Sequence, residues 1–568
     1  AALFLAAMLL VSGWFFCHIL CPLGAVLGLM NPVAMVRVAH DTTRCSGCDL
    51  CVEHCPVNLQ LGEGDFLTRS SCIACGKCVS VCRNGARRWD LHPALQGMLA
   101  AAGAALRAAT FGLVGGATAV AAREALAARR RSEDGRPGTV ELGLSCKGRL
   151  LRRLLPCLAK SPEGMARYAK YHTAFYRQFY AGADENDFRA LPLLRKERVK
   201  DVSPYDLLSD RHRDDVLYYG ETTGSLGSPT PSFYTAREFR GARMLSHLSP
   251  YGPVLRSTLA ENRTAVNGLA FGFTVAGMSF GDVLVATGAM VANVGSRSTL
   301  ATPERIGRAL IRLGPSVVAA APIDFLSWAR IAKEDYPARY DGMVERLRVL
   351  MTTAELCSPQ RVRRLEEHFG VLQINTYACV EGFFALACPC GRQHVLPHYD
   401  AEVLDEALER SSEYGTGRFA FSNLLKRSGP LLRYLLDDQV TIEQCDCPYG
   451  YEKSIFPHGR WELSVLLDGE RLNVAHFEDL IFAHGLFGDY RVSVHEDRLD
   501  VLLEDYAAPE GACERVRESL QKRFGRPVTA QLVPFGKLTA YREVRASKPL
   551  LKLLDRRAAS TQQVPEVM

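Results

Sequence analysis

Eight cysteines near the start of the chain form two runs with the same spacing. The first run is Cys45, Cys48, Cys51 and Cys55, and the second is Cys72, Cys75, Cys78 and Cys82. A tight loop with such short intervals brings three thiolates round one metal centre. Nineteen cysteines occur in 568 residues, and ten of them lie in the first 82. This spacing indicates thiolate ligands in a reducing compartment rather than disulfides.

Both runs have the C-x2-C-x2-C-x3-C pattern of bacterial two-cluster ferredoxins, in which the fourth cysteine of each run binds the other cluster. We therefore predict two [4Fe–4S] clusters, one held by Cys45, Cys48, Cys51 and Cys82, the other by Cys72, Cys75, Cys78 and Cys55. A zinc or disulfide site is the alternative for a single run. Arg83 stands where a proline is usual, which affects the local turn rather than the ligation.

Two C-x-C pairs occur much later in the chain. They are Cys388 with Cys390 and Cys445 with Cys447, and "CPCGRQH" also offers His394. Four thiolates can hold a tetrahedral zinc ion, so we predict a structural Zn2+ site here. Buried structural thiols and a third iron–sulfur cluster are the alternatives. The other cysteines of this part show no ligand pattern, and core positions are expected for them.

Two apolar stretches flank the cysteine runs. Residues 1–30 carry no formal charge and are long enough to cross a bilayer, with a signal peptide as the rival interpretation. Because the chain opens with Ala1 in apolar sequence, we interpret it as a fragment or a processed chain. Residues 98–122 are rich in Ala and Gly and contain Arg107, which is costly in lipid. This second stretch is read as a weak span, a membrane-surface helix or a packed helix.

Cys17 and Cys21 form a C-x3-C-P pair at the end of the first apolar stretch. Such a pair, followed by a dicluster unit, resembles the membrane polyferredoxins of nitrate and nitrous-oxide respiration. The resemblance covers about 90 residues and implies electron transfer with a redox partner or quinol system. We expect a bacterial inner membrane location with the soluble domains facing the cytoplasm. Buried membrane thiols are the alternative for this pair.

The remaining sequence has an ordinary α/β texture. Apolar runs at 316–326 and 417–425 alternate with helical patterns at 303–313 and 358–369. The composition is globular, and a net charge of +6 gives no reason to expect a nucleic-acid partner. We predict a multidomain chain made of an apolar membrane segment (1–36), a small α+β dicluster unit (37–92), an apolar helix with a basic linker (93–139), a large α/β domain (140–460) and a small α+β C-terminal lid (461–568).

Several segments of the large part follow one another in a specific order. They include "YYGETTGSLGSPTPSFYT", "INTYACVEG", "GRFAFSNLLKRSGPLLRYLLDDQVTI" and "FPHGRWEL". This order resembles the phenylacetate–CoA ligase branch of the adenylate-forming enzymes, which includes coenzyme F390 synthetase. The resemblance covers roughly residues 145–558. It implies ATP, Mg2+ and a small-molecule carboxylic acid substrate, with CoA as a thiol acceptor.

The resemblance also implies roles for individual residues. Thr222, Thr223 and Gly224 would belong to a phosphate loop, and Glu381 would help to hold Mg2+ or the phosphates. Tyr377 would lie against the adenine, Asp438 would bind the ribose hydroxyls, and Arg460 would lie beside the hinge of the lid. Lys548 would be the catalytic lysine, with Lys537 as the other candidate. The charge that builds on the phosphoryl oxygens during adenylate formation explains these residue types.

One departure from the pattern is Glu221, which stands where the family's phosphate loop has glycine. A carboxylate beside a triphosphate is repulsive, so Glu221 either points away, binds magnesium or marks lost activity. The leading hypothesis is a membrane-associated iron–sulfur protein fused to a ligase that activates an acid as its adenylate. The alternatives are an electron-transfer protein with a degenerate nucleotide domain, and adenylylation of a redox cofactor. Apolar segments between Phe233 and Gln373 are expected to form the acyl pocket.

Overall fold

The computed structural model describes residues 36–40, 51, 55, 77–82, 86–91, 144, 148–149, 151–152, 155, 159–200, 202–222, 229–296, 298–543 and 551–557. The chain divides into two compact units, residues 1–124 and residues 125–568. Within the described ranges, no helix is both long and apolar enough to cross a membrane. The predicted membrane segment at 1–30 and the apolar stretch at 98–122 lie outside these ranges and stay predictions.

The first unit contains a short antiparallel pair of strands. Strand β1 (Val36–His40) pairs with β2 (Arg87–Leu91), and helix α4 (Lys77–Ser80) lies between them in sequence. Because the two strands stand at opposite ends of the cysteine region, their pairing brings those ends together. Val38 and Cys78 are buried, with Cys51 and Cys55 packed against them. Cysteines from both runs therefore lie in one small core.

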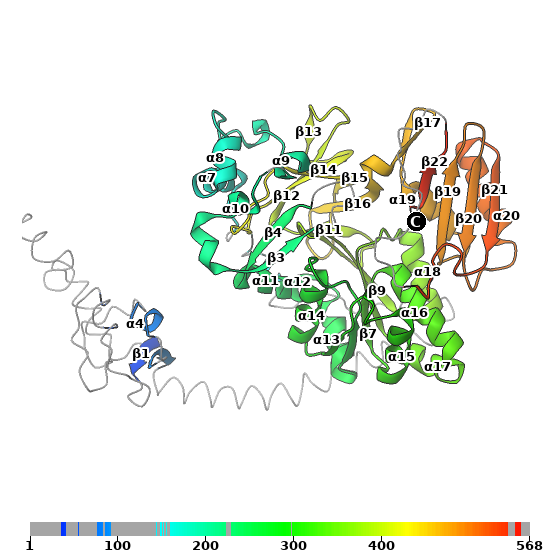
Figure 1. The fold of residues 1–568 in the computed structure, drawn as a ribbon, viewed down its shortest axis with the longest axis horizontal. Helices are drawn as coiled ribbons and strands as arrows, with labels where there is room; N and C mark the ends of the chain where they lie inside the picture. The colour runs from blue at the N-terminus through cyan, green and yellow to red at the C-terminus, as the bar shows by residue number, and fades with distance from the viewer. Residues whose placement is uncertain are drawn as a thin grey trace, which may run out of the picture. The chain divides into compact units, whose positions relative to one another are not determined.

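The second unit is built on a twelve-stranded sheet in the order β13-β12-β14-β15-β16-β11-β10-β9-β8-β7-β5-β6 (Figure 1). Its parallel half consists of β5 (Thr264–Asn267), β6 (Met290–Asn293), β7 (Val317–Ala320), β8 (Val349–Thr352) and β9 (Leu372–Ala378). Its antiparallel half consists of β10 (Phe383–Ala387), β11 (Gln393–Val395), β12 (Tyr399–Leu404), β13 (Ser411–Ser412), β14 (Gly415–Asn423), β15 (Tyr434–Gln444) and β16 (Lys453–Arg460). The predicted α/β fold is confirmed.

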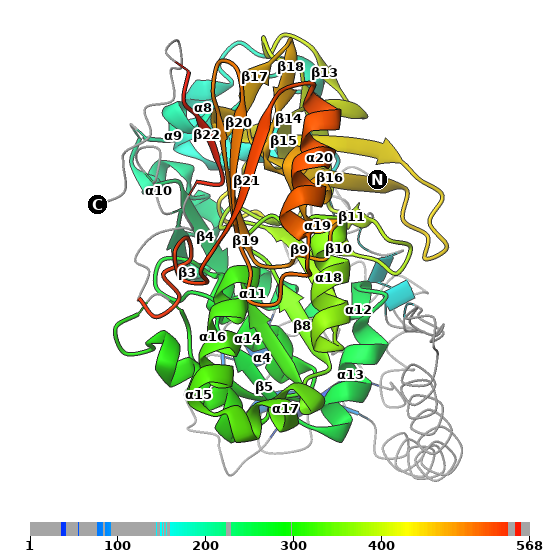
Figure 2. The same cartoon turned by 90° about the vertical axis from the view of Figure 1, so that its right-hand side faces the viewer.

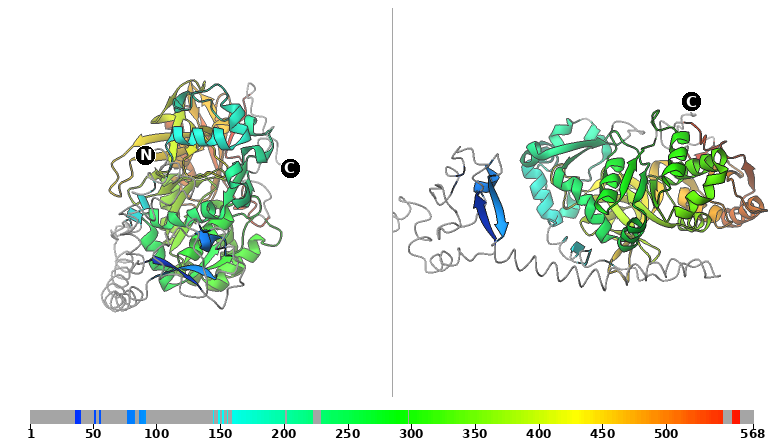
Figure 3. Two further views of the ribbon diagram at one scale, coloured as in Figure 1. Left: turned by 90° about the vertical axis from the view of Figure 1, so that its left-hand side faces the viewer. Right: turned by 90° about the horizontal axis from the view of Figure 1, so that it is seen from below.

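Helices precede and connect the parallel strands, and Figure 3 shows them in green from two further sides. They are α13 (Gly252–Glu261), α14 (Ala276–Ala286), α15 (Pro303–Leu313), α16 (Pro322–Asp335), α17 (Pro337–Arg346) and α18 (Pro359–Phe369). Helices α15 and α18 match the predicted patterns because Thr302 and Ser358 cap their N-termini and left-handed glycines end them. The apolar run at 316–326 is divided: Pro322 starts α16 directly after β7.

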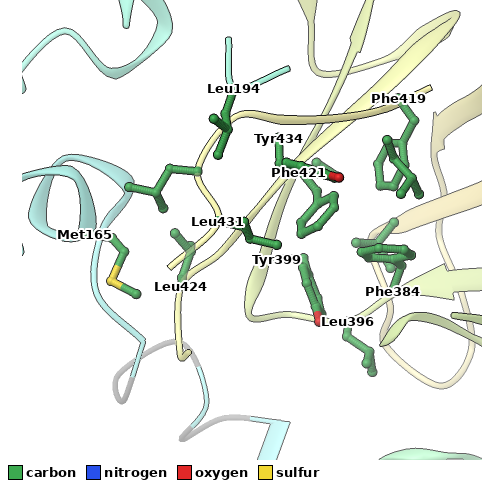
Figure 4. Packing of buried hydrophobic residues seen from close by; sticks show 14 of the residues in the cluster. Met165, Leu194, Phe384, Leu396, Tyr399, Phe419, Phe421, Leu424, Leu431 and Tyr434 are labelled. Atoms are coloured by element: carbon green, nitrogen blue, oxygen red, sulfur yellow. The ribbon is translucent and has the colours of Figure 1, made fainter. Parts of the chain in front are cut away.

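The antiparallel half packs on a layer of N-terminal elements of this unit. These are α7 (Pro162–His172), α8 (Ala174–Phe179), α9 (Lys196–Lys200), α10 (Pro204–Leu207), α11 (Ala236–Gly241), α12 (Leu245–Leu248) and the hairpin of β3 (Val216–Glu221) and β4 (Pro231–Thr235). The shared core is rich in aromatic rings (Figure 4). The ring centroids of Phe384 and Phe421 lie 4.6 Å apart. Tyr434 is fully buried in the same cluster, so this core positions its hydroxyl group.

The C-terminal elements form a smaller α+β layer with a hydrophobic cluster of their own. They are β17 (Val465–Leu467), β18 (Glu470–Leu472), α19 (Val474–Phe482), β19 (Asp489–Val494), β20 (Leu499–Glu504), α20 (Ala512–Phe524), β21 (Val528–Val533) and β22 (Leu553–Asp555). Four of the strands form a sheet in the order β21-β20-β19-β22, with α20 alongside it (Figure 2). This layer is the region predicted to be the lid.

Candidate nucleotide and metal sites

The second unit contains a cavity of about 1800 Å³. Its wall includes part of one apolar stretch of the predicted acyl pocket, with Leu269, Val275 and Phe280 among the lining residues. Five of the residues predicted for the nucleotide and its Mg2+ also line it: Thr222, Tyr377, Glu381, Asp438 and Arg460. Residues more than two hundred positions apart are therefore brought to one cavity, as the resemblance implies.

Tyr377, Asp438 and Arg460 form one hydrogen-bonded group. The hydroxyl of Tyr377 on β9 donates to Oδ2 of Asp438 on β15 at 2.5 Å. Nε of Arg460 on β16 lies 3.0 Å from Oδ1 of the same carboxylate. The pairing of Asp438 with Arg460 across β15 and β16 fixes this arrangement. Burial raises the pKa of Tyr377, and the adjacent Asp438 raises it further, so this phenol stays a hydrogen-bond donor.

Glu381 presents one satisfied and one unsatisfied oxygen. The side chain is 2% exposed, and Oε1 accepts a hydrogen bond from the Tyr434 hydroxyl at 3.2 Å. The same hydroxyl lies 2.9 Å from Oγ1 of Thr230. Oε2 has no hydrogen-bond partner within the described part of the chain. A buried carboxylate oxygen without a partner is a suitable ligand for Mg2+, which prefers oxygen donors.

Thr222 and Thr230 close the base of the segment between β3 and β4. The amide of Thr222 donates to the carbonyl of Thr230 at 3.1 Å, and the amide of Thr230 donates to Oγ1 of Thr222 at 2.9 Å. Both residues line the cavity. Thr223 and Gly224 lie outside the described residues, so their phosphate-binding role stays a prediction.

Glu221 belongs to a different surface from Thr222. Its Oε2 accepts a hydrogen bond from the Tyr219 hydroxyl at 2.8 Å, and Tyr219 is 39% exposed. Side chains two residues apart on a strand share a face, so both point to the same side of β3. The cavity wall includes Thr222 but not Glu221. The unexpected carboxylate therefore has a protein partner outside the cavity.

The candidate catalytic lysines are found in different places. Lys548 lies outside the described residues, and Lys537 is exposed and is not part of the cavity wall. Three further lysines, Lys196, Lys426 and Lys552, line the cavity and were not predicted. Lys426 directly follows the apolar run at 417–425, and this position is the only feature of the sequence that points to its role. Lys552 is paired with buried carboxylates.

Four metal-ligating side chains from the turn after β10, from β11 and from the loop after β15 come together. The donor atoms of Cys388, Cys390, His394 and Cys447 all lie within 4.8 Å of one another. His394 takes the place expected for Cys445, whose Sγ lies 3.6 Å from His394 Nδ1. The Sγ atom of Cys447 is 3.7 Å from the Sγ atoms of both Cys388 and Cys390. Three thiols and one imidazole fit a tetrahedral zinc site.

The imidazole of His394 is oriented for ligation. Nδ1 lies 3.2 Å from the carbonyl oxygen of Lys453, which leaves Nε2, 3.1 Å from Cys390 Sγ, as the ligand atom. The ring stacks on Tyr451 at 4.8 Å, and Tyr451 donates to the carbonyl of Leu248 at 2.6 Å. Burial lowers the pKa of His394, which keeps the imidazole neutral as metal binding requires.

The ligands assigned to the two clusters are described in part. Cys51, Cys55, Cys78 and Cys82 lie within the described residues and are not in disulfides. Cys45, Cys48, Cys72 and Cys75 lie outside them, so the pairing of ligands with clusters stays a prediction.

Known proteins resemble the two units separately. Residues 37–83 match the family described as a 4Fe-4S dicluster domain. An uncharacterised protein of Methanocaldococcus jannaschii is 35% identical over 89 residues, which are 15% of this chain and 35% of that protein. The ferredoxin-type protein NapH of Escherichia coli is 34% identical over 90 residues, 14% of this chain and 31% of NapH. The chain thus spans about a third of the length of these curated relatives.

The second unit resembles solved structures of 2-hydroxyisobutyryl-CoA ligase in the postadenylation state. The complex with 2-HIB-AMP aligns with a TM-score of 0.57 at 16% identity, over 72% of this chain and 91% of that chain. The complex with R3-HIB-AMP gives a TM-score of 0.55 at 15% identity with the same coverage. The larger unit has the fold of the adenylate-forming CoA ligases. Its predicted resemblance is confirmed at the level of fold, and the dicluster resemblance is confirmed at the N-terminus.

Proposed function

We propose that the larger unit activates a carboxylic acid as its acyl adenylate with ATP, and that the dicluster unit couples this reaction to electron transfer. The observation that carries the proposal is the cavity. Tyr377, Asp438 and Arg460 form a hydrogen-bonding group on its wall, and Glu381 presents a carboxylate oxygen without a partner. This set suits a nucleotide with its phosphates.

The residues around the cavity have separate proposed roles. Asp438, fixed by Tyr377 and Arg460, accepts hydrogen bonds from the ribose hydroxyls. Glu381 offers Oε2 to Mg2+, which when bound supplies positive charge for the phosphate oxygens. The apolar wall around Phe280 and Val283 excludes water from the acid. CoA is the proposed acceptor of the acyl group.

A test of this proposal is ATP–pyrophosphate exchange with a panel of aromatic and aliphatic acids. We expect exchange with at least one acid, and a loss of about 10²-fold or more in Asp438→Ala, because the ribose contact and the Tyr377–Arg460 group are both lost. Asp341→Ala is the matched control, since Asp341 is an exposed aspartate outside the cavity wall. Absence of exchange together with absence of ATP binding would refute the proposal.

A degenerate nucleotide domain is less well supported, because its main argument was Glu221, and that carboxylate is bound by Tyr219 outside the cavity. Adenylylation of a redox cofactor remains a distinct candidate, since a dicluster unit and a ligase fold share one chain. It predicts that flavin-like hydroxyl compounds, rather than acids, support exchange.

We also propose that zinc occupies the site of Cys388, Cys390, His394 and Cys447 and stabilises the adjacent cavity wall. Location at the cytoplasmic face of a bacterial inner membrane is proposed from the apolar N-terminal sequence and the NapH resemblance. Membrane fractionation of the native protein tests it.

A further inference from the structure

Lys426 is a buried cation without a hydrogen-bond partner. It lies just after β14, is 4% exposed, and its Nζ atom has no hydrogen-bond partner among the residues described. Its side chain lines the cavity. Burying an ammonium group without a carboxylate is unfavourable, so such a group is expected where a ligand supplies the missing charge.

The surrounding loop holds Lys426 without neutralising it. Nζ lies 3.9 Å from the ring centroid of Tyr234, whose hydroxyl donates to the carbonyl of Val380 at 2.6 Å. The ring is therefore fixed, and the ammonium lies over a rigid face. The backbone amide of Lys426 donates to Asn423 Oδ1 at 3.1 Å, which fixes the start of the loop.

The acidic side chain that contacts this loop, Glu238, is already occupied by hydrogen bonds. Oε1 of Glu238 accepts from the amides of Arg427 and Ser428 at 2.7 and 2.9 Å, and Oε2 accepts from the amide of Thr235 at 2.9 Å. These bonds make Glu238 a clamp for the loop. Glu238 attracts the ammonium electrostatically, but among the described residues the two form no ion pair, so Nζ keeps its hydrogen bonds for the cavity.

Glu381 is the complementary group. Its Oε2 atom also lacks a partner, and it lines the same cavity without forming an ion pair with Lys426. A ligand that satisfies both must carry a cation for the carboxylate and an anionic oxygen for the ammonium. A phosphate chain with a chelated divalent cation does so, whereas a bare carboxylate satisfies Lys426 alone.

We propose that Lys426 binds an anionic oxygen of the nucleotide's phosphate chain, opposite a divalent cation held at Glu381. This inference rests on the proposed function because it places ATP in the cavity. Tyr234 acts as a positioning residue, since its ring lies against the ammonium and its hydroxyl is already bound to the carbonyl of Val380. An ammonium group could equally bind the carboxylate of the acid substrate, so the test distinguishes the phosphate chain from that carboxylate.

The test is calorimetric binding to the full chain in the presence of Mg2+, with pyrophosphate, ATP, adenosine and benzoate as separate probes. In Lys426→Met we expect pyrophosphate and ATP to bind about 10- to 100-fold more weakly, the loss typical of a charged hydrogen bond. Adenosine and benzoate binding should not change. Lys426→Arg should keep most of the affinity. Lys333→Met is the matched control, a lysine 5.7 Å from the ring of Tyr340 outside the cavity wall.

Unchanged pyrophosphate binding in Lys426→Met would overturn the inference, and loss of benzoate binding alone would assign the ammonium to the acid instead. The thermal midpoint of the ligand-free variant should not fall, whereas a merely structural lysine would lower it. Lys426→Gln repeats the measurement if Lys426→Met does not fold. If wild type binds Mg–ATP but shows no pyrophosphate exchange with any acid, the proposed function fails while this inference stands. If it binds none of the anionic probes, both fail.

Discussion

Two groups of buried charged side chains in the larger unit differ in whether the protein itself pairs their charges. The first, which we call the Glu355 network, joins the loop after β8 and helix α18 to the C-terminal layer. Its members are Glu355, Arg361, Glu478, Asp489 and Lys552. The second is the cavity pair of Lys426 and Glu381, which have no ion-pair partner within the described residues.

In the Glu355 network every charge lies 2.6 to 3.8 Å from an opposite one. Arg361 Nη2 also donates to the carbonyl of Gly488 at 2.9 Å. Although burial alone would raise it, Arg361 and Lys552 hold the pKa of Glu355 well below its usual range. Charges that are paired inside the protein fix a joint between two layers. Charges that are left unpaired at a cavity are available to a ligand. The contrast therefore distinguishes buried charges that stabilise the fold from buried charges that bind a ligand.

The largest effect should come from breaking the Glu355 network. Arg361→Met leaves Glu355 and Glu478 buried without their guanidinium partner, which typically costs about 3–5 kcal/mol. Urea unfolding of the full chain measures this as a lower midpoint. Arg517→Met on α20 removes a solvent-exposed pair with Glu514 and should leave the midpoint almost unchanged. A loss below about 1 kcal/mol for Arg361→Met would contradict the structural role of the network.

The proposed zinc site adds a second test of the comparison, because its donor atoms converge on one point and contact mainly one another. Cys447→Ser should lose most of the bound zinc and lower the thermal midpoint by a few degrees. Cys445→Ser is the matched control and should retain about one zinc per chain, since His394 occupies the fourth position. Metal analysis after dialysis checks both variants. Loss of zinc in both variants would restore the four-thiolate set that the two C-x-C pairs predict.

Removing the charge of Lys426 should raise the free energy of unfolding, whereas breaking the Glu355 network should lower it. Burial lowers the pKa of Lys426 to about 8, below the value of an unfolded lysine. The charged form therefore destabilises the fold below pH 8, and this cost disappears as the pH rises from 8 towards about 10. Lys426→Met should be more stable than wild type by about 1–3 kcal/mol at pH 7.

The difference in unfolding free energy between Lys426→Met and wild type should shrink over pH 8–10, because other titrating groups are common to both chains. Urea unfolding at several pH values measures it. The titratable groups that face Lys426 are Glu238 on α11 and Cys379 and Glu381 after β9. Glu238→Gln would alter this profile, and an unaltered profile there would indicate that desolvation alone sets the stability cost. A variant less stable than wild type at pH 7 would make Lys426 a structural residue.

The sequence predicts some of these features better than others. Helices α15 and α18 were predictable because their caps and apolar spacing are local. The grouping of Tyr377, Asp438 and Arg460 followed from segment order, although Tyr377 and Asp438 are 61 residues apart. Lys426 and the Glu355 network were not predicted, because an isolated charge in a sequence does not reveal its partners. Arg361 and Gly488 are 127 residues apart, and only the packing of the C-terminal layer brings them together.

Substituting Glu221 should have the smallest effect, a change in Mg–ATP affinity, and it tests where the cavity ends. Because its carboxylate is bound by Tyr219 on the other face of β3, Glu221→Ala should change Mg–ATP affinity less than about twofold, as expected for a screened charge near the surface. Thr222→Val, one residue along, removes the oxygen that accepts from the Thr230 amide and should weaken binding more. Calorimetry compares the two variants at low and high salt. A tenfold gain in affinity for Glu221→Ala would mean that this carboxylate repels the phosphates, and the cavity would then extend across β3.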